Sequence, residues 1–129
     1  MKVKLAGFAL AGLVVLTLGF SSVALAAGGV AGTYKTTITN SGHLNGKWVV
    51  VLKRGTYTVS MNGNAVARGR YSATATTITF DRETGSDCSG AGVYAWKRSG
   101  KTMTFVRKRE TASCRARAAV LTRRFTQVR

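Results

Sequence analysis

The sequence contains few side chains suited to proton transfer. Its 129 residues include one histidine, His43, and four carboxylates, Asp81, Glu83, Asp87 and Glu110. Asp81 and Glu83 are two residues apart on a predicted strand, so they share a face and a paired-carboxylate site is geometrically possible. A solvated acidic patch that balances nearby arginines is the simpler interpretation. His43 has no evident partner and is predicted to lie on the surface.

Motifs of catalytic and metal-binding proteins are also lacking. The chain has no glycine-rich phosphate loop, no nucleophile elbow and no metal motif. Two cysteines and one histidine offer little to a four-ligand metal site. We therefore predict a protein that is not an enzyme, with no catalytic residues, no bound metal and no cofactor.

The first residues have the order of a cleavable secretion signal. Lys2 and Lys4 precede a largely apolar stretch, Leu5–Phe20, and small residues follow, ending in Ala24-Leu25-Ala26. A membrane anchor is the alternative, but the uninterrupted apolar core is shorter than the roughly 20 residues that a spanning helix needs. We predict a signal peptide over residues 1–26 and a secreted or cell-envelope protein.

Residues 27–129 are long enough for one domain. Twenty Lys and Arg against four Asp and Glu give the chain a formal net charge of +16, and loss of the two lysines in the signal lowers it to about +14. This excess concerns solubility and partners rather than fold, and it favours anionic surfaces. We expect a monomer.

Two cysteines, Cys88 and Cys114, lie in the exported part, where an oxidising compartment allows a disulfide. Such a bridge would stabilise the fold by roughly 3 kcal/mol on the loop-entropy model. Two free thiols or a metal site are the alternatives.

Period-two alternation rich in Thr, Val, Tyr and Phe recurs after Ala27, whereas helical spacing over three turns does not. Short turns such as Arg54-Gly55 and Asn62-Gly63-Asn64 separate the strands. Eight strands are predicted, over Gly32–Thr39, Gly46–Lys53, Thr56–Met61, Ala65–Ala73, Thr76–Arg82, Gly92–Arg98, Thr102–Arg109 and Arg117–Gln127. The fold class is therefore all-β, an eight-stranded antiparallel up-and-down barrel whose closure removes exposed edges.

The alternation also assigns the two faces of each strand. The predicted inward residues are Tyr34, Ile38, Trp48, Val50, Leu52, Tyr57, Val59, Met61, Tyr71, Ile78, Phe80, Tyr94, Trp96, Met103, Phe105, Leu121 and Phe125. The predicted outward residues include Lys47, Arg68, Arg70, Lys108 and Arg124. Alternate loops of a meander lie at the same end, which places Cys88 and Cys114 close enough to be bridged.

Several short motifs follow one another along the chain. In order, they are Gly46-Lys47-Trp48, Gly55-Thr56-Tyr57, Gly69-Arg70-Tyr71, Gly92-Val93-Tyr94-Ala95-Trp96 and Cys114-Arg115-Ala116-Arg117. The chain in this respect resembles small secreted bacterial proteins with a lipocalin-like, or calycin-type, β-barrel. The resemblance implies a barrel open to a ligand at one end. It also implies an arginine packed on the aromatic residue of the first strand, which here suggests Arg123 on Tyr34.

We predict a binding protein for a small apolar or amphipathic ligand inside the barrel. The candidate ligand-binding residues are Trp48, Tyr57, Met61, Phe80, Tyr94, Trp96, Phe105 and Arg107. A barrel filled by its own aromatic side chains is the alternative. Arg107 is placed to pair with a ligand's carboxylate or phosphate, unless its strand has already left the barrel at that point.

The basic clusters suggest another function. Lys53-Arg54, Lys97-Arg98 and Lys101 gather at the predicted closed end, and Arg107-Lys108-Arg109, Arg115 and Arg117 gather at the open one. An exported protein with this charge would meet anionic lipid, teichoic-type polymer or extracellular nucleic acid, although no specific nucleic-acid motif is present. An inhibitor or partner-binding barrel also stays open as an interpretation.

Overall fold

The computed structural model describes residues 29–128, so the signal predicted over residues 1–26 lies outside the described part of the chain. The strands are β1 (Gly32–Ile38), β2 (Gly46–Lys53), β3 (Thr56–Met61), β4 (Asn64–Ala73), β5 (Thr77–Thr84), β6 (Gly92–Ser99), β7 (Thr102–Arg109) and β8 (Phe125–Val128). The helices are η1 (Gly42–Leu44), η2 (Ala112–Cys114) and α2 (Arg115–Leu121). None of these described helices has the length and apolar character needed to cross a membrane.

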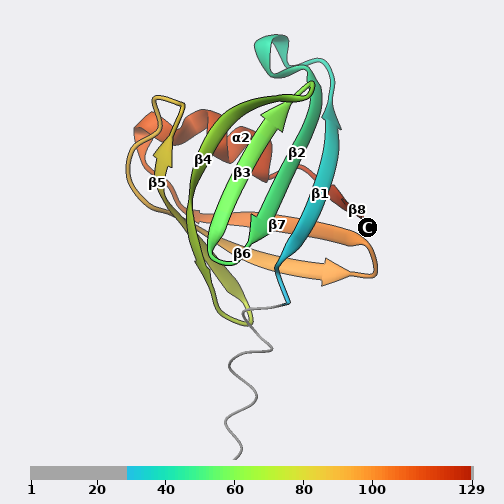
Figure 1. Ribbon diagram of the computed structural model, residues 1–129, viewed down its shortest axis with the longest axis vertical. Helices are drawn as coiled ribbons and strands as arrows, with labels where there is room; N and C mark the ends of the chain where they lie inside the picture. The colour runs from blue at the N-terminus through green and yellow to red at the C-terminus, as the bar shows by residue number, and fades with distance from the viewer. Residues whose placement is uncertain (1–28, 129) are drawn as a thin grey trace, which may run out of the picture.

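Each strand pairs antiparallel with the next, and β8 returns to β1, so the sheet closes into a barrel (Figure 1). The predicted eight-stranded up-and-down barrel is confirmed, and the first seven strands begin and end within two residues of their predicted limits. Local turn chemistry explains this agreement. Asn62 and Gly63 have φ values of 51° and 85°, the backbone that Asn-Gly adopts in a two-residue hairpin turn.

The eighth predicted strand is wrong over most of its length. Residues 115–121 form α2, and only Phe125–Val128 pair as β8. Arg117, Val120 and Leu121 are buried at the i, i+3, i+4 spacing of one helix face, and the alanines between them favour helix. A helix of two turns is too short to show apolar residues recurring at helical spacing over three turns, which is the pattern that predicts a helix from sequence.

Aromatic rings form the centre of the core. Phe80 packs edge-on against Tyr57, Tyr94 and Phe105, with ring centroids 5.1, 5.7 and 6.1 Å away. The predicted inward residues are buried or, for Val59, Met61, Tyr71 and Trp96, half-buried against the core. Lys47, Arg68, Arg70, Lys108 and Arg124 are exposed, as predicted. Strand alternation therefore identified the faces of these residues, except that Leu121 is buried on α2 and not on a strand.

The arginine that packs on the first-strand aromatic is Arg98, not the predicted Arg123. The Arg98 guanidinium carbon lies 5.7 Å from the Tyr34 ring centroid, and Arg98 also donates to the Tyr34 hydroxyl. Burial raises the pKa of Tyr34 against the opposing effect of Arg98, so the phenol stays protonated and donates to the carbonyl of Val30 at 2.7 Å. Arg123 is exposed because it follows α2 instead of lying in a strand.

A disulfide joins Cys88, in the β5–β6 loop, to Cys114, the last residue of η2. The predicted disulfide is confirmed, and residues 29–128 contain no free cysteine. The two segments meet because alternate connections of the meander share one end of the barrel. The bridge therefore ties the β5–β6 loop to the start of α2.

Replacing both cysteines by alanine is expected to lower the free energy of unfolding by about 3 kcal/mol. The bridge closes a loop with a sequence separation of 26 residues, and its loss increases the entropy of the unfolded chain. Urea unfolding followed by circular dichroism measures the effect. Wild-type protein in reductant should unfold like the double variant, and equal stability of the oxidised and reduced wild type would contradict the prediction.

Candidate functional site

A cavity of about 480 Å³ lies between α2 and the inner faces of β2, β3 and β4, next to the disulfide. In Figure 1, α2 crosses behind these strands. The apolar and aromatic residues that line the cavity are Trp48, Val50, Tyr57, Val59, Val66, Ala67, Phe80, Ala116, Val120 and Leu121. Its polar residues come mainly from the β5–β6 loop and the start of α2. The cavity is thus an apolar chamber with a polar rim.

The helix lies at the cavity because β8 is short. β8 pairs with β7 only through Thr102 and Met103, and with β1 only as far as Lys35. Beyond these pairs α2 takes the place of a strand and packs against β7. Its buried face then supplies Val120 and Leu121 to the cavity, where an ideal eighth strand would have closed the wall.

A bulge in β5 turns Glu83 toward the inside of the barrel. Arg70 is opposite Asp81 and Arg68 is opposite Thr84, so β5 has an extra residue there, and Arg82 adopts a left-handed φ of 52°. The expectation that Asp81 and Glu83 share a face is therefore wrong. Asp81 is exposed, whereas Glu83 lines the cavity.

Two hydroxyl groups hold the Glu83 carboxylate in place. The Tyr57 hydroxyl donates to Oε1 at 2.8 Å, and the Ser86 hydroxyl donates to Oε2. Burial and the neighbouring Glu83 carboxylate raise the pKa of Tyr57 against the opposing effect of Arg117, so the phenol remains a neutral donor at neutral pH. Glu83 has no cationic partner within salt-bridge distance among the described residues.

Beside the cavity lies a buried ion pair between Arg117 of α2 and Glu110. Arg117 donates from Nε to Oε2 at 2.9 Å and from Nη2 to Oε1 at 2.6 Å, and the two side chains are 4% and 1% exposed. The Tyr94 hydroxyl also donates to Glu110. A Cβ on Gly92 would lie 2.7 Å from Arg117 Nη2, so the pair fits only because this residue is glycine.

Arg117 was expected in the basic cluster at the open end. It does lie at that end, where it lines the cavity, but its side chain is buried and paired with Glu110 instead of joining the exposed basic residues. The helix turns its guanidinium inward, where Nη2 also donates to the Gly90 carbonyl at 3.0 Å and Nη1 has no hydrogen-bond partner. Burial by itself would raise the pKa of Glu110, but hydrogen bonds from Arg117, Tyr94 and the Thr111 amide together lower it. Glu110 is therefore ionised at neutral pH and balances the charge of Arg117.

Three predicted ligand-binding residues, Trp48, Tyr57 and Phe80, line the cavity together. Tyr94 and Phe105 are buried in the aromatic core and do not line it. Met61 is half-buried against the core and is likewise not among the lining residues.

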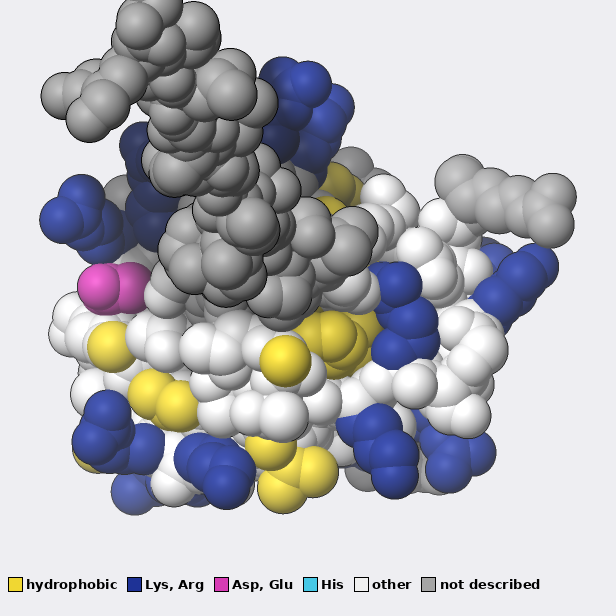
Figure 2. Space-filling view, turned by 90° about the horizontal axis from the view of Figure 1, so that it is seen from below, with side chains coloured by type: hydrophobic (Ala, Val, Ile, Leu, Met, Phe, Trp, Pro, Cys, Tyr) yellow, Lys and Arg dark blue, Asp and Glu magenta, His cyan; other side chains and the backbone are white. Residues whose placement is uncertain are grey.

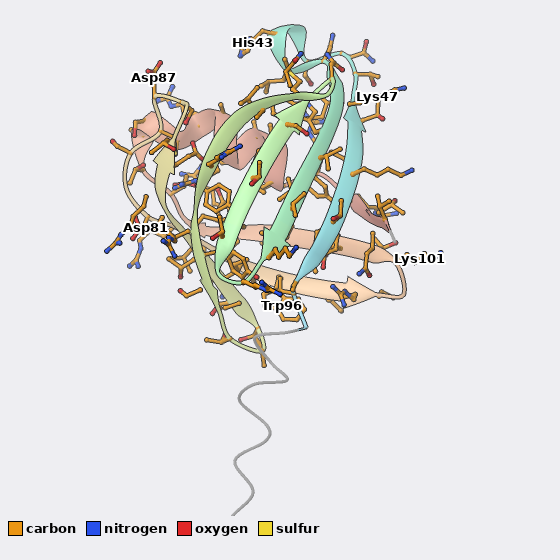
Figure 3. The ribbon with its side chains drawn as sticks, in the orientation of Figure 1. His43, Lys47, Asp81, Asp87, Trp96 and Lys101 are labelled. Atoms are coloured by element: carbon orange, nitrogen blue, oxygen red, sulfur yellow. A yellow bond between two sulfur atoms is a disulfide. The ribbon has the colours of Figure 1, made fainter. Side chains whose placement is uncertain are left out.

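Trp96 and Arg107 lie elsewhere. Trp96 donates its indole N–H to the Thr74 carbonyl at 3.0 Å and borders a shallow groove beside β6 and β7. Figure 3 shows Trp96 at the opposite end of the barrel from Asp87, which lines the cavity. Arg107 is exposed together with Lys108 and Arg109. The strand has not left the barrel, because β7 stays paired with β6 as far as Arg109, but an extra residue of β7 opposite Val93 and Tyr94 makes the register irregular there.

The fold and cavity define an eight-stranded antiparallel closed barrel, compatible with a lipocalin-like fold, with an apolar chamber at its mouth. No family model, no curated protein and no solved structure matches this chain.

Proposed function

We propose that this protein is a non-enzymatic, lipocalin-like binding protein that holds a small apolar or amphipathic ligand in the cavity at the barrel mouth. The apolar cavity of about 480 Å³ is the observation that carries the proposal. It falls within the range of roughly 300–1,000 Å³ that is usual for small-molecule sites. Its walls are mainly aliphatic and aromatic, which favours an apolar ligand body.

We further propose that the protein acts outside the cytoplasm. The predicted signal over residues 1–26 supports export, and the Cys88–Cys114 disulfide is of the kind that forms and persists in oxidising compartments. Membership of the calycin-type barrels is part of the same proposal, and the closed antiparallel barrel supports it.

Filling the cavity is expected to abolish binding of an apolar fluorescent probe. Val120→Trp places an indole in the chamber, because Val120 is buried on the face of α2 that lines it. We expect probe affinity to fall at least about tenfold, since the ligand loses most of its buried apolar area. Fluorescence titration measures the change, and Val59→Phe fills the same space from β3 if the first variant folds poorly.

The matched control is Val106→Trp, because Val106 is 62% exposed on β7 and does not line the cavity. Its probe affinity should equal that of the wild type. Equal affinity in all three proteins would overturn the cavity as the binding site. Native mass spectrometry of protein purified from its own culture medium then tests for a retained small molecule.

Binding of polyanions at the surface is the second candidate function. Every Lys and Arg within residues 29–128 is exposed except Arg98 and Arg117, and Figure 2 shows these side chains spread across the face in view. Binding to anionic vesicles or polymers would weaken steeply with salt. Val120→Trp would leave it unchanged, so the cavity variant and a salt titration separate the two functions.

A further inference from the structure

The charged residues of the cavity indicate the chemistry of the ligand's polar end. Glu83 and Asp87 line the cavity, and Arg117 is its one basic lining residue. The charge of Arg117 is already matched by Glu110 through two hydrogen bonds. Two carboxylates without an ion pair therefore line the cavity, Glu83 half-buried and Asp87 exposed, in a chain whose formal net charge is +16.

The Glu83 carboxylate is half-buried and has no ion-pair partner among the described residues. The Arg117–Glu110 pair is the single ion pair within residues 29–128, so neither Glu83 nor Asp87 pairs with any of the many described Lys and Arg. Glu83 instead accepts hydrogen bonds from the neutral hydroxyls of Tyr57 and Ser86. These fix the position of the carboxylate without forming an ion pair, and a carboxylate held in this way suits a cationic ligand group.

Resting on the proposed function, we propose that the ligand is a cationic amphiphile, with an apolar body in the chamber and a protonated amine at Glu83 and Asp87. The exposed Lys and Arg oppose this attraction weakly, because salt screens surface charges beyond about 8 Å at physiological ionic strength. A half-buried carboxylate beside an apolar wall is screened less than these surface charges.

Three probes with the same alkyl chain test the charge preference: decylammonium, decanol and decanoate, each used below its micelle concentration. Isothermal titration to the oxidised protein should rank decylammonium first. Glu83→Gln keeps an acceptor for Tyr57 but removes the charge, so decylammonium affinity should fall about tenfold or more, as expected for loss of a charge-assisted hydrogen bond. Decanol affinity should change by less than about twofold in Glu83→Gln, because decanol is uncharged and loses no charge-assisted hydrogen bond.

Asp81→Asn is the matched control, because it makes the same change of charge on the same strand outside the barrel. Asp81 is exposed and is not among the cavity-lining residues, so all three affinities should stay at wild-type values. Decanoate could also adsorb to the basic surface. Binding heat from such adsorption should persist in Val120→Trp, in which the chamber is filled, so this variant separates surface adsorption from binding in the cavity. Urea unfolding of each variant verifies that it is folded.

The outcomes separate this inference from the proposed function. Equal affinities for the three probes, or tighter cavity binding of decanoate, would overturn the cationic ligand and keep the binding chamber. An equal loss of decylammonium affinity in Glu83→Gln and Asp81→Asn would also overturn it, because the effect would then be one of net charge. If Val120→Trp does not weaken the binding of any of the three probes, the proposed function itself would be overturned.

Discussion

Replacing Arg117 by methionine is expected to lower the free energy of unfolding by about 3–5 kcal/mol, because it leaves a buried carboxylate without its cation. Glu110 is 1% exposed and receives two hydrogen bonds from Arg117. Urea unfolding followed by tryptophan fluorescence measures the loss. If the variant does not fold, the milder Glu110→Gln should still show a clear loss of stability.

Arg115→Met is the control for the Arg117 variant. Arg115 lies on the same helix, is exposed and makes no ion pair in the described structure, so its replacement should change stability by less than about 0.5 kcal/mol. Combining Arg117→Met with Glu110→Gln should cost less than the sum of the two single changes, because the residues interact directly. If the stability losses of the two single variants simply add in the double variant, the predicted interaction between Arg117 and Glu110 would be contradicted.

The same ion pair predicts the pH dependence of stability. The folded-state pKa of Glu110 is lowered, so its contribution to stability is complete above the unfolded value of about 4.3 and is lost as pH falls through the folded value. Urea midpoints should therefore decrease below about pH 4. The decrease should be shallower in Glu110→Gln, which has no carboxylate to protonate.

Replacing Phe80 by alanine is expected to cost about 3–5 kcal/mol of stability, as deletion of a fully buried aromatic ring usually does. Phe80 is 0% exposed and packs against three aromatic rings. Urea unfolding measures the effect, with the exposed Val106→Ala as a control near wild type. Phe80→Leu should lose less because it leaves a smaller void, and equal stability of Phe80→Ala and wild type would contradict the packing.

The barrel and part of its site could be predicted because they depend on local signals. Trp48, Tyr57 and Phe80 alternate with polar neighbours on strands bounded by recognisable turns, so their inward direction follows from the strand period. Cys88 and Cys114 follow from the same meander, since the parity of its loops brings them to one end. These inferences need only neighbours in sequence and the number of strands.

Glu83 and Arg117 could not be placed in this way. Glu83 faces the cavity because one extra residue in β5 reverses the alternation after Asp81, and no local motif marks that bulge. Arg117 lies on a helix of two turns whose alanines and spaced apolar residues are a weak signal. Its partner Glu110 is brought to it by the end of β7 and the disulfide-linked segment.

The sequence by itself determined the all-β class, the order of the first seven strands, the inward aromatic residues and the cysteine pairing. Alternation, turn residues and loop parity are properties of neighbouring residues and of strand number. Only the tertiary structure decided that α2 replaces most of the eighth strand, that a chamber remains beneath it, and that Glu83 lines this chamber. These features depend on which distant side chains fill the same space, and the burial of Arg117 beside Glu110 stabilises one such arrangement.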